Sequence, residues 1–309
     1  MVSIKELIDR PEALCGGHRA CAGCGAPIVA RQVLLASPDP VVVVSATGCL
    51  EVTTTIFPYT AWNVPFLHNA FENSAATMSG VVAAYEAFKK KKKIEGKINF
   101  VAFGGDGGTY DIGFQSLSGA MERGHNLLYV CYNNEGYMNT GIQRSGATPK
   151  GSNTTTEPAG KVRQGKVKFS KDLTQIIAAH NIPYVAQSIV GDFIDLTKKA
   201  EKAFSIEGAK FLNVLQPCRL GWAYKEEETC QLGRDAFDAC IWPLYEVEKG
   251  ILKITKKPRE KKPVDFFLKK QGRFRHLFKP GNEQILKDIQ DEVDRRWDVL
   301  LSKDGKQIF

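Results

Sequence analysis

The sequence lacks any apolar run long enough to cross a membrane. Its longer apolar runs, such as residues 41–44, fall far short of the roughly 20 residues that a bilayer-spanning helix needs. No basic and then apolar leader opens the chain, whose first ten residues are polar and amphipathic. We therefore expect a cytoplasmic protein without a membrane partner.

The sequence also has few signs of a histidine-based metal site or of nucleic-acid binding. Its five histidines show no spacing typical of metal ligands. The net charge is +8, but from residue 249 onward 17 Lys and Arg stand against nine Asp and Glu, so that segment carries the whole excess. No recognised nucleic-acid-binding motif accompanies it. We interpret residues 249–309 as a basic extension that contacts another subunit, and we expect no nucleic-acid partner.

Apolar runs alternate with helical patterns along the rest of the chain, which predicts an α/β fold: a mostly parallel sheet with helices on both faces. One domain is expected over residues 1–248. The expected strands cover residues 41–46, 98–103, 127–132, 183–189 and 210–215. Helices are expected over residues 2–8, from about residue 27, and over 72–88, 112–123, 172–180, 193–205, 232–245 and 283–301. Residues 50–71 should be mostly irregular, and the polar segment 143–170 should form a lid or a subunit-contact loop.

The most informative stretch, residues 101–141, carries polar groups after two successive strands. Asp106 lies in a glycine-rich turn with Gly105, Gly107 and Gly108, and Asn134 follows the next strand. Because the two strands form one βαβ unit, their carboxyl ends meet at the same edge of the sheet, and Asp106 should lie beside Asn134. Oxygen ligands of this kind suit Mg²⁺ shared with a phosphorylated ligand. The glycines let backbone N–H groups approach phosphate oxygens.

This arrangement resembles the thiamine diphosphate signature, in which a GDG turn is followed by an asparagine pair. Here Asn133-Asn134 follow the turn after about 27 residues. The resemblance implies that Asp106, Asn134 and the backbone carbonyl of Gly136 hold Mg²⁺ on the diphosphate. A GDG taken alone would be more typical of an ordinary turn.

Eight cysteines in a chain without a secretory leader argue against disulfides and for metal or redox chemistry. Four of them lie in loops at strand ends or helix entries: Cys21, Cys24, Cys49 and Cys218. Such a set suits a 4Fe–4S cluster or a structural zinc ion. Cys49 and Cys218 should face the sheet edge that carries Asp106. A redox cluster there could accept electrons from the cofactor, so we favour the cluster over zinc and over unliganded thiols.

Taken together, the motifs resemble the β subunit of the 2-oxoacid:ferredoxin oxidoreductases over roughly residues 15–245. They are HRACAGCGAP, the strand end Thr47-Gly48-Cys49, GGDGGTYDIG, NNEGYMNTGIQRSGATP and PCRLGW. The resemblance implies the thiamine diphosphate-binding fold, with the four cysteines named above on the cluster nearest the cofactor. It further implies that Asn139 contacts both substrate and cofactor, and that Gly48 and Cys49 line the cofactor site. PCRLGW departs from the more usual Pro-Cys-Pro.

The resemblance also implies an activity. A 2-oxoacid, with pyruvate favoured, would be oxidatively decarboxylated to acyl-CoA and CO₂, and electrons would pass through the 4Fe–4S cluster to ferredoxin. Thiamine enzymes need a glutamate against the aminopyrimidine ring, and only Glu51 and Glu72 lie near the motifs, neither convincingly. An α subunit would therefore complete the site. Ferredoxin-like and γ subunits, ferredoxin, the 2-oxoacid and coenzyme A would be the other partners.

Three alternatives remain open at this point. The same fold could act on oxalate or on branched-chain 2-oxoacids. A non-redox thiamine diphosphate decarboxylase or carboligase could carry a structural zinc ion. An iron–sulfur electron-transfer subunit could have lost its thiamine cofactor.

Overall fold

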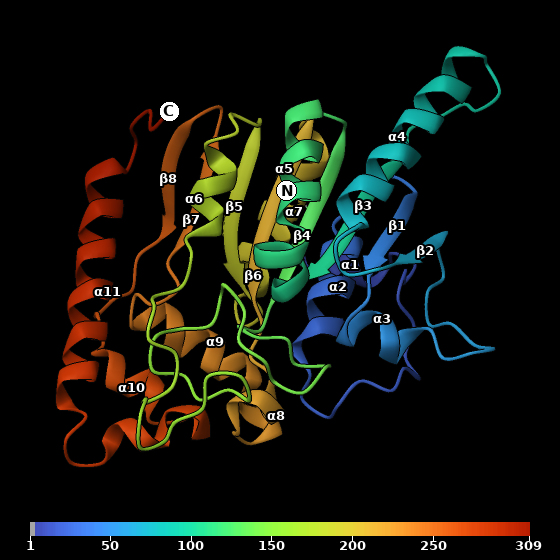
Figure 1. The fold of residues 1–309 in the computed structure, drawn as a ribbon. Helices are drawn as coiled ribbons and strands as arrows, with labels where there is room; N and C mark the ends of the chain where they lie inside the picture. Colours follow the sequence, from blue (N-terminus) through green and yellow to red (C-terminus); the bar gives the residue numbers. More distant parts are fainter. Residues whose placement is uncertain (1–3) are drawn as a thin grey trace.

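The centre of the molecule is an eight-stranded sheet of order β2-β1-β3-β4-β6-β5-β7-β8 (Figure 1). It is seen in a computed structural model that describes residues 4–309. The strands are β1 (Val41–Ala46), β2 (Phe66–Asn69), β3 (Asn99–Gly105), β4 (Leu127–Asn133), β5 (Tyr184–Ile189), β6 (Ala209–Leu215), β7 (Leu244–Glu248) and β8 (Ile251–Lys256). Strands β1 to β6 are parallel, and β7 and β8 add an antiparallel pair at one edge. The predicted, mostly parallel sheet is confirmed.

Helices cover both faces of this sheet, as predicted. The α-helices are α1 (Ile4–Ile8), α2 (Gly25–Leu35), α3 (Cys49–Thr54), α4 (Ser74–Lys90), α5 (Phe114–Arg123), α6 (Leu173–Ala178), α7 (Phe193–Ser205), α8 (Arg219–Trp222), α9 (Thr229–Asp238), α10 (Val264–Leu268) and α11 (Glu283–Lys303). A π-helix, η1 (Gly107–Ile112), and two 3₁₀ helices, η2 (Glu226–Glu228) and η3 (Gly272–Phe278), complete the elements. Of the helix expected over residues 2–8, the part before residue 4 lies outside the described residues.

The apolar strands are buried on both sides because their successive side chains enter two different cores. In β3, Val101 and Phe103 pack on the face covered by α2 and α7. Phe100 and Ala102 pack on the opposite face, which α4, α5 and α6 cover. This double burial explains why the strands read as continuous apolar runs, while the parallel pairing of β1, β3 and β4 places their carboxyl ends at one edge.

Residues 50–71 are mostly irregular, as expected, but they also contain most of α3 and the edge strand β2, which pairs with β1 in parallel. One expectation about regular structure was wrong. The helix expected over residues 232–245 ends with α9 at Asp238, and the chain then forms β7. Cys240 has a left-handed φ of 55° and Pro243 lies just before β7, so the backbone cannot continue as a helix.

The basic extension is built into the main body. Its predicted start, between residues 248 and 249, falls in the turn that joins the paired strands β7 and β8. Trp297 and Leu300 of α11 pack in the same core as Leu252 and Ile254 of β8. The charge change at residue 249 therefore does not coincide with a break in the sheet. Its contact with another subunit stays a prediction.

No helix within residues 4–309 combines the length and the apolar character that crossing a bilayer requires.

Candidate active site

The predicted site residues gather where the parallel strands β1, β3, β4 and β6 end. This edge is the lower side of Figure 1, where α2, α3, α8 and the long segment after β4 lie. Cys49 follows β1, Asp106 follows β3, Asn134 follows β4 and Cys218 follows β6. The topology alone predicted this meeting of strand ends, and the structure confirms it.

Asp106 is fully buried at the start of η1. Its Oδ1 accepts a hydrogen bond from the backbone N–H of Asn134 (3.1 Å), and its Oδ2 accepts one from the Ser145 hydroxyl (2.5 Å). Burial raises the pKa of Asp106 to about 7, although these two hydrogen bonds oppose the shift. A divalent cation beside the carboxylate would offset the cost of burying its charge.

The amide of Asn134 faces two further oxygens. One of its terminal atoms lies 2.9 Å from Asp106 Oδ1 and 2.9 Å from the Gly136 carbonyl oxygen, and the other lies 3.1 Å from Gln216 Nε2. With the amide oxygen toward Asp106, three oxygens converge with no hydrogen between them, which is a donor set for Mg²⁺. With the NH₂ group there, the amide instead bonds both oxygens.

Unlike the neighbouring Asn134, Asn133 has a structural role. Its Nδ2 donates to the Tyr110 hydroxyl (3.0 Å), and its Oδ1 accepts from the backbone N–H of Glu135 (2.9 Å). The side chain is thus fully engaged in shaping the turn after β4, and only Asn134 is turned toward Asp106.

The glycines of the motif make room for close contacts. A Cβ on Gly107 would lie 2.4 Å from the Tyr137 ring, and one on Gly48 would lie 2.6 Å from the Tyr132 hydroxyl. The expected glycine-rich turn is in fact the opening of the π-helix η1, a form that is frequent at functional sites. The backbone directly after Asp106 therefore has no side chains at Gly107 and Gly108 and forms the first turn of a π-helix.

A small cavity of about 30 Å³, which we call the strand-end cavity, lies between these elements. The predicted residues that line it are Gly48, Cys49, Gly105, Gly107, Gly108, Asn134, Gly136 and Asn139. Tyr132 also lines it, is 1% exposed, and its hydroxyl has no hydrogen-bond partner in the described chain. Of the described residues that line the cavity, none is a glutamate.

The four predicted cluster cysteines lie close enough to influence one another's charge. Burial raises the pKa of Cys24 to about 11 and that of Cys49 to about 12, and in both cases repulsion from other members of the set adds to the shift. The Asn139 side chain hydrogen-bonds Cys49 and opposes its shift. The Cys218 sulfur accepts from the backbone N–H of Gly221 (3.4 Å). Burial and repulsion disfavour the thiolate forms of Cys24 and Cys49, and a cationic metal group would offset both effects.

No three His, Cys, Asp or Glu side chains within residues 4–309 are arranged to hold one metal ion. A zinc ion needs all its sulfurs about 2.3 Å from one point. The cysteines of a 4Fe–4S cluster each bind through their own thiolate to a larger group. The choice between a cluster and zinc stays a prediction.

The segment over residues 143–170 is partly fixed against the site. Thr148 Oγ1 donates to the Glu135 carbonyl (2.7 Å), and the buried Lys166 donates to the carbonyls of Thr148 (2.5 Å) and Ser145 (3.2 Å). Residues 155–163 are mostly exposed. Its role as a lid or subunit contact stays a prediction, while its Ser145 is a direct partner of Asp106 that the sequence did not indicate.

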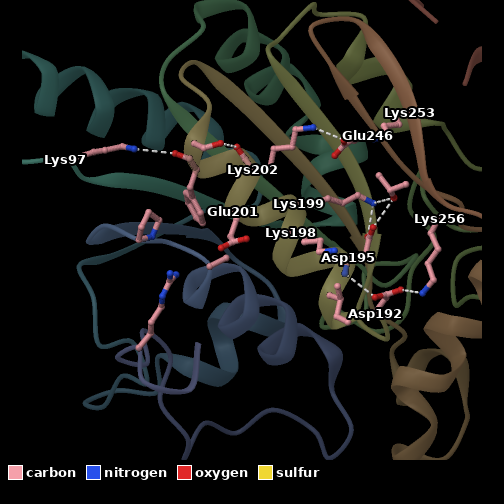
Figure 2. Close-up of a pocket in the computed structure, with 17 residues that line it drawn as sticks. Lys97, Asp192, Asp195, Lys198, Lys199, Glu201, Lys202, Glu246, Lys253 and Lys256 are labelled. Carbon is pink, nitrogen blue, oxygen red and sulfur yellow. Dashed lines mark hydrogen bonds and ion pairs between the residues drawn. The ribbon is translucent and has the colours of Figure 1, made fainter. Parts of the chain in front are cut away.

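A much larger cavity, of about 1020 Å³, runs along α7 (Figure 2). None of the predicted site residues lines it. Its lining has seven cationic and four acidic side chains, among which Lys199 pairs with Asp195 (2.8 Å), Lys202 with Glu246 (2.7 Å) and Lys256 with Asp192 (2.5 Å). We call it the α7 cavity, and its size alone does not make it a site.

Comparison with known proteins defines the class. The family model "Thiamine pyrophosphate enzyme, C-terminal TPP binding domain" matches residues 46–214. The chain is therefore a thiamine pyrophosphate-binding protein. A solved 2-oxoglutarate:ferredoxin oxidoreductase from Magnetococcus marinus shares the fold, with a TM-score of 0.56 and 17% identity over 73% of this chain and 81% of that chain.

Closer relatives narrow the class. The chain is 52% identical to pyruvate synthase subunit PorB of Thermotoga maritima over 97% of this chain and 96% of that protein. It is 54% identical to the same subunit of Methanocaldococcus jannaschii, over 92% of this chain and 96% of that protein. The chain belongs to the pyruvate synthase PorB family, the β subunits of pyruvate:ferredoxin oxidoreductases. Identity to the ketoisovalerate oxidoreductase subunit VorB of Pyrococcus abyssi is lower, 41%, over 94% of this chain and 95% of that protein.

Proposed function

We propose that this chain is the thiamine diphosphate-binding subunit of an enzyme that converts pyruvate and coenzyme A to an acyl-CoA and CO₂. Two electrons leave, one at a time, through a 4Fe–4S cluster to ferredoxin. The observation that carries the proposal is that one cavity is lined both by Gly105, Gly107 and Asn134, the neighbours of Asp106, and by Cys49. This supports a decarboxylation site next to an electron exit.

The oxygens around Asp106 are proposed to hold Mg²⁺. Asp106, Asn134 and the Gly136 carbonyl already converge, and burial makes the metal-free carboxylate costly. Ser145 orients the second oxygen of Asp106 through its 2.5 Å hydrogen bond. Gly107 and Gly108 line the strand-end cavity in the first turn of η1, and we assign their backbone N–H groups to the diphosphate oxygens. Thiamine diphosphate supplies the electron sink for decarboxylation.

Cys21, Cys24, Cys49 and Cys218 are proposed to hold the cluster. The family model begins at residue 46 and ends at residue 214, so of these four only Cys49 falls inside the general thiamine domain. The other three are additions around that domain, as expected for a redox group that only some thiamine enzymes carry. Asn139 bridges the two parts, since it bonds Cys49 and lines the strand-end cavity. We assign it to the reacting substrate.

A partner subunit is proposed to complete the site. The strand-end cavity of about 30 Å³ is too small for a whole cofactor and has no glutamate among its described lining residues. Glu51 is instead engaged with Thr55 (2.7 Å) and lies 3.5 Å from His68. The relatives are named as subunits, which supports a complex. We propose an α subunit that supplies the glutamate and the rest of the cofactor-binding surface, together with γ and ferredoxin-like subunits.

Pyruvate is the favoured substrate because relatives at 52–54% identity are named for it, whereas the relative named for ketoisovalerate is 41% identical. A branched-chain 2-oxoacid is the second candidate. Oxalate is a third, which no observation favours.

The test is to purify the assembled complex without oxygen and to measure its metal content and its CoA-dependent reduction of a viologen dye. We expect iron, a broad visible absorbance, and faster reduction with pyruvate than with 2-oxoisovalerate, 2-oxoglutarate or oxalate. The isolated chain should be inactive. Zinc in place of iron, or 2-oxoacid decarboxylation without dye reduction, would show a non-redox thiamine enzyme instead. Iron without thiamine diphosphate binding would show an electron-transfer subunit.

A further inference from the structure

A buried ion pair lies directly behind the proposed magnesium site. The Glu135 carboxylate accepts a hydrogen bond from Arg273 Nη2 at 2.5 Å, and the two side chains are only 4% and 2% exposed. Glu135 stands between the proposed ligands Asn134 and Gly136, and its φ of 64° is left-handed. That conformation is unfavourable for a residue other than glycine, so surrounding contacts must hold it.

Arg273 supplies several of these contacts from the C-terminal extension. Its guanidinium lies 3.7 Å from the centroid of the Trp222 ring. Trp222 in turn donates its indole N–H to the Asn134 carbonyl (2.8 Å). Gln271 accepts from Arg273 Nε (2.8 Å), which fixes the guanidinium plane. Through the Glu135 side chain and through Trp222, one arginine that is 138 residues away from Glu135 in the chain therefore supports the backbone that follows Asn134.

The same guanidinium faces the proposed cluster. Arg273 Nη1 is buried and has no hydrogen-bond partner in the described chain. Cys218 caps α8, the helix that ends with Trp222, and its carbonyl accepts from the backbone N–H of Trp222 (2.8 Å). Arg273 therefore contacts Glu135 in the metal-binding turn and also Trp222, which is bonded to a proposed cluster cysteine.

We propose that Arg273 is a positioning residue for both cofactors: through Glu135 it fixes the turn that binds Mg²⁺, and through its charge it raises the reduction potential of the cluster at Cys218. The inference rests on the proposed function. Residues that hydrogen-bond or orient metal ligands commonly change the metal affinity by about 10- to 100-fold. A cluster gains negative charge on reduction, so a buried cation nearby favours the reduced form.

The experiment uses the anaerobic, iron-loaded complex. Cluster potential is measured by an EPR-monitored redox titration, and Mg²⁺-dependent thiamine diphosphate binding by calorimetry. For Arg273→Gln we expect a more negative potential and an affinity loss of about 10- to 100-fold. Arg273→Lys keeps the positive charge but loses the guanidinium, which bonds Glu135 through Nη2 and Gln271 through Nε. It should therefore keep the potential and lose affinity. Arg275→Gln, which removes the same charge from an exposed position of η3, should change neither quantity.

Glu135→Gln separates charge from structure. It should also weaken cofactor binding, but it should shift the potential in the positive direction, opposite to Arg273→Gln. A merely structural role would move both variants the same way and would overturn the redox part. Unchanged cofactor affinity in Arg273→Gln would overturn the positioning part.

Arg273→Gln leaves Glu135 buried without its partner and can fail to fold. In that case the double variant Glu135→Gln/Arg273→Gln removes both charges, and we expect it to fold with weaker cofactor binding and a smaller negative shift. An unshifted potential in the double variant would overturn the redox part. If the unsubstituted complex holds no iron, or binds no thiamine diphosphate, the proposed function fails instead.

Discussion

The α7 cavity and the strand-end cavity differ in size and, more usefully, in how their polar groups are satisfied. The α7 cavity is about 1020 Å³ and the strand-end cavity about 30 Å³. In the larger one, buried Lys199 donates to Asp195 (2.8 Å), the Gln187 carbonyl (2.7 Å) and Thr255 (2.9 Å), so all three of its donors are used. The charges there stabilise the fold.

The strand-end cavity shows the opposite condition. The Tyr132 hydroxyl lacks a partner in the described chain, and burial together with mutual repulsion raises the pKa of the nearby Cys24 and Cys49 thiols. Buried polar groups are nearly always paired in folded proteins, so a collection of unpaired ones marks a place that a ligand completes. In this molecule, unpaired polar groups indicate the candidate site better than cavity volume does.

The largest effect should come from Asp106→Ala. It removes the only carboxylate of the proposed magnesium site, so Mg²⁺-dependent thiamine diphosphate binding should fall by more than about 100-fold, beyond what outer partners of a metal ligand contribute. The metal-free chain should be no less stable, because the buried carboxylate has a pKa raised to about 7. Calorimetric binding and urea unfolding measure the two quantities.

Asp192→Asn in the α7 cavity is the matched control. The amide can still cap α7, as the Asp192 side chain does now, while the ion pair with Lys256 is lost. Cofactor binding should be unchanged. Near-normal cofactor binding in Asp106→Ala, or a loss of binding in Asp192→Asn, would end the distinction between the two cavities.

A smaller effect, on stability and not on cofactor binding, is expected for Lys199→Met. Asp195 would be left largely buried without its cation, which should lower the free energy of unfolding by about 3 kcal/mol. The folded protein should bind thiamine diphosphate and Mg²⁺ with unchanged affinity. Urea unfolding and calorimetry check both statements. A weakened affinity in protein that is still folded would give the α7 cavity a part in cofactor binding.

The local part of the site could be predicted from the sequence because it depends on neighbouring segments. Two apolar runs separated by a helix define one βαβ unit, and its handedness and parallel strands bring Asp106 to Asn134 without further information. The same reasoning placed Cys49 and Cys218, since each follows a strand of the same sheet.

The supporting residues could not be predicted in this way. Ser145 and Arg273 reach the site across 39 and 138 residues of chain, and nothing in their local sequence specifies where they end. β2 was missed because a four-residue edge strand has little apolar pattern of its own and forms by pairing with β1. β7 was missed because the helical pattern of α9 continued past the left-handed Cys240.

The smallest predicted effect tests a single oxygen. Tyr132→Phe removes a buried hydroxyl that lacks a partner in the described chain, so the stability of the metal-free chain should be unchanged or higher by up to about 1 kcal/mol. Thiamine diphosphate affinity should fall by about three- to tenfold if the hydroxyl bonds the cofactor, the range of one ordinary hydrogen bond.

Tyr129→Phe is the matched control, because its hydroxyl is equally buried but lies 3.2 Å from the Ser74 hydroxyl and 3.1 Å from that of Thr109. Its loss should lower stability by about 1 kcal/mol and leave cofactor affinity unchanged. The two tyrosines lie on opposite faces of the same strand, so the pair compares a satisfied with an unsatisfied buried hydroxyl. Equal stability losses and unaltered affinity in both variants would mean that the Tyr132 oxygen serves no ligand, and that an unpaired group at this edge is not enough to indicate binding.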